Sequence, residues 1–373
     1  MREYLLVFLV AASVTFLAAS LLRHIAIRIG MFAQVRARDM HTLPIPYLGG
    51  VAMFVGLAVA LLFGVQMPFL GRHPIVAHDA FAVVLAGLVL TLIGAIDDKI
   101  DLPALVKLGG QGLVAGIVVL QGVRIYWIPL PDRIIALDDA SSILITMFFI
   151  ALCTNAVNFV DGLDGLASGV VAIGALSFFS YAYFLAYEHE LVRATTASLI
   201  TVATAGICLG FLLHNWHPAK MFMGDAGSML LGLLMAMSTI SFTGQIDPSA
   251  LTGGSADVLP ALLPILVPFA ALVLPLLDLG LAYIRRTMNG QYWFVADRSH
   301  IHHRLVARGH SIRGAVLLMY SWTALVSGGL VAIGLSDSAL VGWGIVAFLI
   351  IVLIWTVRPI QSTRTPIGDD GTR

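Results

Sequence analysis

Residues 80–98 read AFAVVLAGLVLTLIGAIDD, an uncharged run that ends in two adjacent aspartates. A helix of about 20 apolar residues spans the hydrocarbon core of a bilayer. Inside lipid, backbone N–H and C=O groups have no water to bond, so such a run must form a helix. The stretch therefore predicts a membrane-spanning helix whose acidic pair lies at one face of the bilayer.

The composition extends this prediction to the whole chain. Its 373 residues are 59% hydrophobic and only 11% charged, and the mean hydropathy is +0.95. Soluble domains carry about 25% charged residues, so the composition excludes a soluble globular enzyme. The 21 basic and 21 acidic residues balance, which gives no support to a nucleic-acid partner. Cys153 and Cys208 lie in apolar runs and are expected to be buried thiols rather than a disulfide.

Other apolar runs of similar length predict an all-α polytopic integral membrane protein with about eleven transmembrane helices. We expect the first run to be a retained span, because no convincing cleavage site follows it. If the N-terminus is outside, sixteen of the 21 basic residues fall on the inner side, which predicts a cytoplasmic C-terminus. Residues 1–357 then form a single transmembrane domain, and residues 358–373 form a disordered cytoplasmic tail. The runs lie near residues 4–22, 48–66, 79–96, 105–122, 141–157, 166–186, 194–213, 226–243, 259–284, 314–334 and 339–357.

The aspartates gather at the predicted cytoplasmic ends of these helices. Asp97 and Asp98 end the third run, Asp161 and Asp164 follow the fifth, and Asp225 opens the eighth. Adjacent acids repel each other beside an apolar run unless a cation holds them. A helix cap for Asp225, or a structural turn for Asp161 and Asp164, is the alternative interpretation. Together the acids predict an oxygen-only site suited to Mg²⁺.

A basic segment supplies the opposite charge. Residues 300–304 read HIHHR, so that His300, His302, His303 and Arg304 lie in one predicted cytoplasmic loop. Guanidinium and imidazolium groups bind phosphates well, which predicts a site for a diphosphate. A zinc site of three histidines is the alternative, but His302 and His303 would point apart on a helix and no cysteine accompanies them.

Five ordered motifs resemble the polyprenyl-phosphate N-acetylhexosamine-1-phosphate transferases. Asp101 and the spacing of residues 300–304 are similar to the WecA/TagO branch, the undecaprenyl- or decaprenyl-phosphate GlcNAc-1-phosphate transferases. Tyr47 departs from the family pattern, in which many relatives carry Arg, Thr or Leu. The motifs are Gly49-Gly50, Asp97-Asp98-x-x-Asp101, Asn155-x-x-Asn158-x-x-Asp161-Gly-x-Asp164-Gly165-Leu166, residues 218–228 around Asp225, and His300-x-His302-His303-Arg304-Leu305.

The resemblance implies transfer of N-acetylglucosamine-1-phosphate from UDP-GlcNAc to a polyprenyl phosphate. The reaction would release UMP and form polyprenyl-diphosphate-GlcNAc at the cytoplasmic face of the bacterial inner (plasma) membrane. That step initiates a cell-envelope polysaccharide such as lipopolysaccharide, teichoic acid or arabinogalactan. The implied enzyme is a Mg²⁺-dependent phosphotransferase, with Mn²⁺ as the alternative metal. Its partners would be UDP-GlcNAc, polyprenyl phosphate, membrane lipids and a second copy in a homodimer, without nucleic acid.

Motif matching also implies roles for individual residues. Asp225 is the expected principal metal ligand, assisted by Asp98 or Asp161, and Asp97 would orient or deprotonate the lipid phosphate. A covalent aspartyl intermediate is the alternative, although the lipid phosphate is itself a competent nucleophile. The expected catalytic residues are Asp97, Asp98, Asp161 and Asp164. The expected substrate-binding residues are Asn158, His300, His302, His303, Arg304 and Lys107.

Other functions stay open. One is phospho-N-acetylmuramoyl-pentapeptide transfer within the same family. A membrane phosphatase would share magnesium and aspartates, and a proton-coupled transporter would place its acids near the bilayer midplane. The ninth run carries Pro260, Pro264, Pro268 and Pro275, which predict a bent helix. We expect its bend to open a lateral groove for the prenyl chain; improved packing alone is the alternative.

Overall fold

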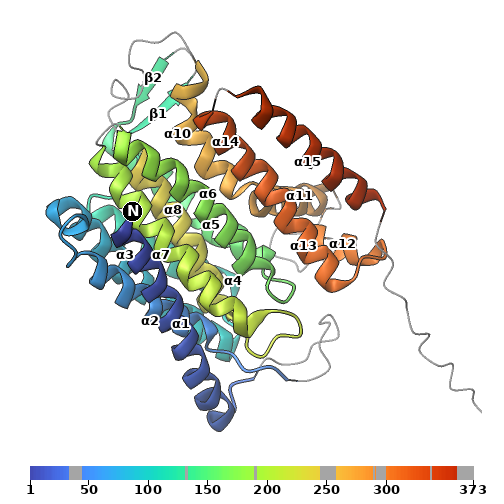
Figure 1. Cartoon of the computed structure of the whole chain (residues 1–373). Helices are drawn as coiled ribbons and strands as arrows, with labels where there is room; N and C mark the ends of the chain where they lie inside the picture. The colour runs from blue at the N-terminus through green and yellow to red at the C-terminus, as the bar shows by residue number, and fades with distance from the viewer. Residues whose placement is uncertain are drawn as a thin grey trace, which may run out of the picture.

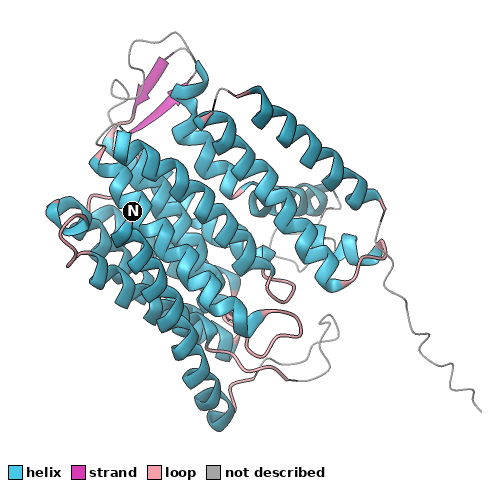
Figure 2. Ribbon diagram, in the orientation of Figure 1, coloured by secondary structure: helices cyan, strands magenta, loops and turns pink. Residues whose placement is uncertain are grey.

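The computed structural model describes most of the chain. It is almost entirely helical, with one small hairpin among the described residues (Figure 2), which confirms the all-α polytopic prediction. The predicted tail lies outside the described part, apart from Arg358. The described residues are 1–32, 44–130, 133–188, 191–243, 258–288, 290, 300–336 and 338–358.

Eight helices of the described part are long and apolar enough to cross a membrane. One of them is continuous through a π-helical turn, Ala324–Gly328, which joins α13 to α14. The number of spans and the side of each terminus stay predictions. The long helices are α1 (Arg2–Ile29), α3 (Pro74–Ile100), α5 (Asp139–Val160), α6 (Leu166–Glu188), α7 (Val192–Asn215), α8 (Gly224–Thr243), α13 with α14 (Ile312–Thr323 and Gly329–Leu335) and α15 (Ala339–Val357).

Shorter helices complete the bundle. Helices α2 (Gly49–Gly64) and α4 (Ala104–Leu120) are apolar, and α12 (Ile301–Ala307) has two turns. The proline-rich ninth run forms two helices, α10 (Val258–Ala271) and α11 (Val273–Met288). The predicted bend therefore lies at Leu272, because Pro275 has no N–H to donate to the carbonyl of Ala271 four residues earlier. The lateral groove stays a prediction.

Two local features differ from the sequence-based expectation. Helix α1 continues to Ile29, so that Arg23 and Arg28 lie on its last turns and not in a loop. Between α4 and α5, strands β1 (Trp127–Leu130) and β2 (Arg133–Ala136) pair antiparallel, where only a loop was expected. Short strands rich in β-branched and aromatic residues are typical of such a hairpin.

Helices α7 and α8 form the centre of the bundle, and α15 lies at its edge (Figure 1). In α8, 94% of the most apolar 18-residue stretch is buried inside the protein, whereas in α15 the buried share is 6%. A helix that is apolar on all sides is stable either in a core or in contact with lipid. Helix α8 is therefore shielded by its neighbours, whereas α15 presents most of its surface for lipid contact.

Two glycines allow α2 and α3 to reach the first turn of α8. A Cβ on Gly50 would meet the backbone of Gly227, and one on Gly94 would meet the backbone of Ala226. The backbone N–H groups of Gly49 and Gly50 also donate to the carbonyls of Phe222 and Met223, at 3.1 and 2.9 Å. These contacts fix the start of α8, and with it Asp225, against the neighbouring helices.

Candidate active site

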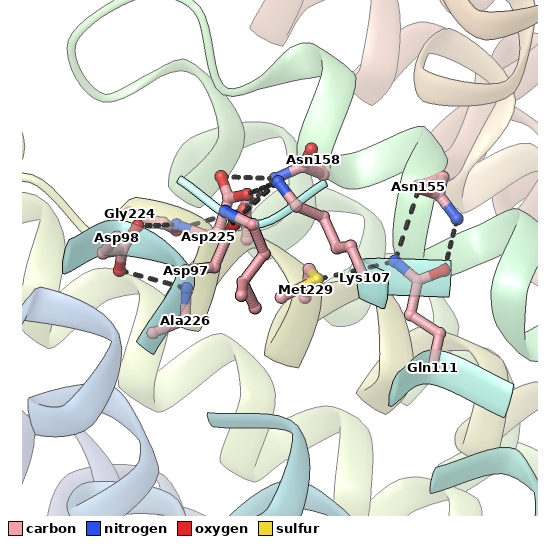
Figure 3. A network of polar contacts seen from close by, with 12 residues as sticks. Asp97, Asp98, Lys107, Gln111, Asn155, Asn158, Gly224, Asp225, Ala226 and Met229 are labelled. Atoms are coloured by element: carbon pink, nitrogen blue, oxygen red, sulfur yellow. Dashed lines mark hydrogen bonds and ion pairs between the residues drawn. The ribbon is translucent and has the colours of Figure 1, made fainter. Parts of the chain in front are cut away.

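Two of the predicted aspartates share one lysine (Figure 3). Nζ of Lys107, in the first turn of α4, lies 2.5 Å from Oδ2 of Asp97 and 2.5 Å from Oδ2 of Asp225. The other oxygen of Asp97 accepts a hydrogen bond from the backbone N–H of Leu102 at 2.8 Å. Three helices therefore deliver two carboxylates and one ammonium to a single point, where the sequence predicted acidic and substrate-binding residues.

Asn158 holds the second oxygen of Asp225. Its amide nitrogen donates to Oδ1 of Asp225 at 2.9 Å and to Oγ of Ser228 at 2.8 Å. The structure therefore gives Asn158 a role in positioning Asp225. The predicted contact of Asn158 with the nucleotide stays a prediction.

One helical turn deeper, an amide pair joins α4 to α5. The side chains of Gln111 and Asn155 exchange hydrogen bonds at 2.6 and 3.4 Å, and Gln111 also approaches the sulfur of Met229 (Figure 3). Gln111 follows Lys107 by four residues, so both side chains lie on the same face of α4. The pair thereby fixes the rotation of α4 that presents Lys107 to the aspartates.

Asp98 faces away from this point. Its carboxylate accepts hydrogen bonds from the backbone N–H groups of Asp225 at 2.7 Å and Ala226 at 3.4 Å. The first N–H groups of a helix lack partners within the helix, and a carboxylate satisfies them and complements the helix dipole. Asp98 therefore caps α8 from a neighbouring helix. Its expected role as an assisting metal ligand stays a prediction.

Asp161 follows the last residue of α5, and its carboxyl group has no cationic partner among the described residues. Its side chain makes no hydrogen bond or ion pair with the described residues. Burial, together with the nearby carboxylates of Asp225 and Asp164, raises the pKa of Asp161 to about 7. The carboxylates here are thus in excess over the protein's own positive charge.

Asp164 lies in a separate contact. Its Oδ2 is 2.6 Å from Nδ1 of His217 and accepts a hydrogen bond from the backbone N–H of Ala219 at 3.0 Å. Arg313 in turn donates to the carbonyl of His217 at 2.9 Å. Asp164 therefore fastens the α7–α8 loop to the connection between α5 and α6, and its expected catalytic role stays a prediction.

The basic segment is anchored beside the same end of α5. Oδ2 of Asp278, in α11, lies 2.9 Å from Nδ1 of His300, and its other oxygen accepts from the N–H of Ile301 at 2.9 Å. The ring of Phe159 lies against His300 and also under the guanidinium of buried Arg286. Because Phe159 directly follows Asn158, the turn that positions Asp225 also contacts the basic segment.

The other basic residues lie on α12. The ring of His303 is 6.5 Å from that of His300, and Arg304 is exposed. The side chain of His302 is outside the described part. The structure thus brings His300 and His303 together, while the predicted diphosphate contacts of these residues stay predictions.

The residues present fit a magnesium ion better than a zinc ion. Among the described residues, no three histidine, cysteine or acidic side chains surround a common point. Mg²⁺ typically binds one or two carboxylates and takes its other ligands from water and substrate phosphates. Asp225 with Asp97 or Asp161 offers that kind of donor set, and the excess of carboxyl groups over lysine at this point favours a cation.

The sequence-based prediction assigned no role to several residues of this site. These residues are Asp278, Arg286, Phe159, His217 and Gln111. A buried acid and arginine in an apolar helix are costly unless paired, so the intramembrane position of Asp278 was the available signal. Gln111 within the apolar α4 gave the same kind of signal.

Comparison with known proteins agrees with this geometry. The family model described as glycosyl transferase family 4 matches residues 80–243. A decaprenyl-phosphate N-acetylglucosaminephosphotransferase of Mycobacterium tuberculosis is 43% identical over 88% of this chain and 82% of its own length. A probable undecaprenyl-phosphate N-acetylglucosaminyl 1-phosphate transferase of Bacillus subtilis is 32% identical, over 86% and 82%. A phospho-N-acetylmuramoyl-pentapeptide-transferase of Moorella thermoacetica is 35% identical over 52% of this chain and 60% of its own. The chain belongs to glycosyl transferase family 4.

Proposed function

We propose that the protein transfers N-acetylglucosamine-1-phosphate from UDP-GlcNAc to a polyprenyl phosphate, at the cytoplasmic face of a bacterial plasma membrane. The observation that carries the proposal is the meeting of Asp97, Lys107 and Asp225 at the end of membrane-spanning helices. A lipid phosphate can reach that position from the bilayer, and a nucleotide sugar can reach it from water. The relatives named as GlcNAc phosphotransferases support the same substrates.

The chemistry exchanges one diphosphate bond for another. An oxygen of the lipid phosphate attacks the β-phosphorus of UDP-GlcNAc, and the bond from that phosphorus to the bridging oxygen breaks. UMP leaves with the bridging oxygen and its electron pair. Such transfers depend mainly on positioning and charge neutralisation.

Two groups of residues would share this work: Asp97 with Lys107, and His300 with His303. Asp97 is held by Leu102, so it can orient the lipid phosphate or accept its proton at a fixed place. Lys107, whose side chain is partly exposed, can bind donor phosphate oxygens. His300 and His303 would contact the diphosphate and sugar, with His300 oriented by Asp278.

Asp225, with Asp97 or Asp161, would hold a Mg²⁺ ion. When bound, the ion supplies charge neutralisation for the diphosphate and the departing UMP. Asn158 keeps Asp225 turned toward the site, and Asp98 fixes the helix start on which Asp225 lies.

The experiment is UMP release from UDP-GlcNAc by purified protein in detergent, with and without polyprenyl phosphate and with and without Mg²⁺. Release should require both additions, and Asp97→Asn and Asp225→Asn should lower kcat about 10²–10³-fold. Asp139→Asn is the matched control, because Asp139 is exposed beside the hairpin far from this site. UMP release only from the N-acetylmuramoyl-pentapeptide donor would refute the assignment. Turnover equal to that of the wild type in Asp97→Asn and Asp225→Asn would refute it as well.

A further inference from the structure

We propose that Lys107 is an internal counter-cation that must leave the Asp97–Asp225 pair before a divalent ion can bind there. The proposal deepens the proposed function, and it concerns the order in which two cations use one pair of carboxylates. It predicts that the ammonium competes with Mg²⁺ instead of assisting its binding.

The geometry carries the first step. Both Oδ2 atoms lie 2.5 Å from the same Nζ, so they are at most about 5 Å apart. Two oxygens bound to one Mg²⁺ at about 2.0–2.1 Å lie no more than about 4.2 Å apart. The separation of the two carboxylate oxygens is therefore compatible with one shared ion. The ion and the ammonium cannot both lie between these two oxygens.

The other oxygen of each carboxylate is already hydrogen-bonded, which strengthens the competition between the two cations. Oδ1 of Asp97 is used by the backbone N–H of Leu102, and Oδ1 of Asp225 is used by Asn158. The oxygens that face Lys107 are therefore the ones left for a cation. Both fixed hydrogen bonds also prevent the carboxylates from turning to offer the ion a different oxygen.

Lys107 is able to leave. Its side chain is 23% exposed and that of Asp225 is 28% exposed, whereas Asp97 is 3% exposed. The site is therefore open on the side of Lys107 and Asp225. A lysine carries its charge on four flexible methylene groups, so the ammonium can move to solvent while the α4 backbone stays in place. The released ammonium would remain within reach of phosphate groups, in agreement with the predicted substrate-binding role of Lys107.

The charge balance explains why the exchange is favourable. Asp97 and Asp225 share the single positive charge of Lys107, and the carboxyl group of Asp161 lies near that of Asp225. A divalent ion neutralises more of this charge than an ammonium does. Without such an ion, Lys107 would limit the repulsion between Asp97 and Asp225.

The first test measures Mg²⁺ binding by calorimetry on the full-length protein in detergent, without substrate. We expect Lys107→Met to bind Mg²⁺ about tenfold more tightly than the wild type, because the competing ammonium is gone. Lys99→Met is the matched control, since Lys99 is exposed at the end of α3 and should not change the affinity. Unchanged or weaker binding by Lys107→Met, or no binding by either protein, would overturn the proposal.

The second test separates displacement from a general effect of charge. The chain has three lysines, Lys99, Lys107 and Lys220, so acetylation by a water-soluble reagent can be followed for each by mass spectrometry. Saturating Mg²⁺ should raise the acetylation rate of Lys107 several-fold and leave Lys99 and Lys220 unchanged. An unchanged rate at Lys107 while calorimetry shows binding would refute the exchange. UMP release from the same preparation would then still stand, so failure of this inference is distinguishable from failure of the proposed function.

Discussion

The carboxylate of Asp98 accepts a hydrogen bond from the backbone N–H of Asp225 at 2.7 Å, and this contact ties the end of α3 to the first turn of α8. Asp97, the preceding residue, instead faces Lys107. Successive side chains on a helix diverge by about 100°, so two adjacent aspartates reach different neighbours. One acid positions the helix that carries Asp225, and the other lines the proposed reaction site.

Asp98→Ala should therefore act mainly on stability. Loss of a capping acceptor costs about 0.5–2 kcal/mol of the free energy of unfolding, and we expect a lower melting temperature in detergent. Mg²⁺ affinity should fall less than in Asp225→Asn, because Asp98 contacts the backbone. A fall in affinity as large as that of Asp225→Asn, with the melting temperature unchanged, would show that Asp98 binds the metal directly.

The pH dependence of stability should reveal Asp161. The pKa of Asp161 in the folded protein is raised to about 7, above the value of about 3.9 for an unfolded aspartate. Between these values the folded state binds more protons than the unfolded state. The contribution of Asp161 to the free energy of unfolding therefore falls as the pH rises from about 4 to about 7.

Asp161→Asn removes that loss. Without added metal, we expect the variant to be more stable than the wild type at pH 7.5, with a smaller difference at pH 5, by chemical denaturation in detergent. Asp164→Asn is the matched control, because Asp164 accepts hydrogen bonds from His217 and Ala219 and its loss should lower stability. Equal stability of wild type and Asp161→Asn at both pH values would contradict the expectation.

The sequence predicted which residues are polar at a helix end, but not which of them meet. Asp225 at the start of α8 and Asp97 at the end of α3 were both identified from apolar runs that stop at an acid. The contact of each acid with Lys107 depends on the rotation of α4, which packing and the Gln111–Asn155 pair set. Periodicity within one helix carries no information about that rotation relative to another helix.

The same limit applies to the basic segment. Residues 300–304 were selected because three histidines and an arginine lie together in the chain. Asp278 is 22 residues earlier, in a different helix, and only the fold places it against His300. The bend at Leu272 was predictable because it depends on a local effect of Pro275, whereas the Asp278–His300 contact depends on where the second half of the bent helix lies.

Asp278→Ala should impair donor binding more than it impairs folding of the bundle. It removes the acceptor for His300 and for the N–H of Ile301 at the start of α12. We expect kcat/KM for UDP-GlcNAc to fall about 10–100-fold, with most of the change in KM for the donor, because His300 loses its fixed orientation. Asp278→Asn keeps an acceptor and should retain more activity. Equal losses in both variants would show that the charge of Asp278, and not its hydrogen bonds, matters.

Close packing against α8 should be the most sensitive structural feature of the site. Ala at Gly50 or Gly94 would place a Cβ against the backbone of Gly227 or Ala226. Backbone cannot yield as a side chain can, so each substitution should lower the free energy of unfolding by about 1–3 kcal/mol. Each should also reduce UMP release, because the start of α8 carries Asp225.

Gly112→Ala in α4 is the matched control, since a Cβ there has no atom within 4 Å and Ala favours a helix by about 1 kcal/mol over Gly. Thermal unfolding in detergent measures all three variants. Equal melting temperatures would show that α2 and α3 can separate from α8 at little cost, and that Asp225 is positioned by Asn158 and Asp98 alone.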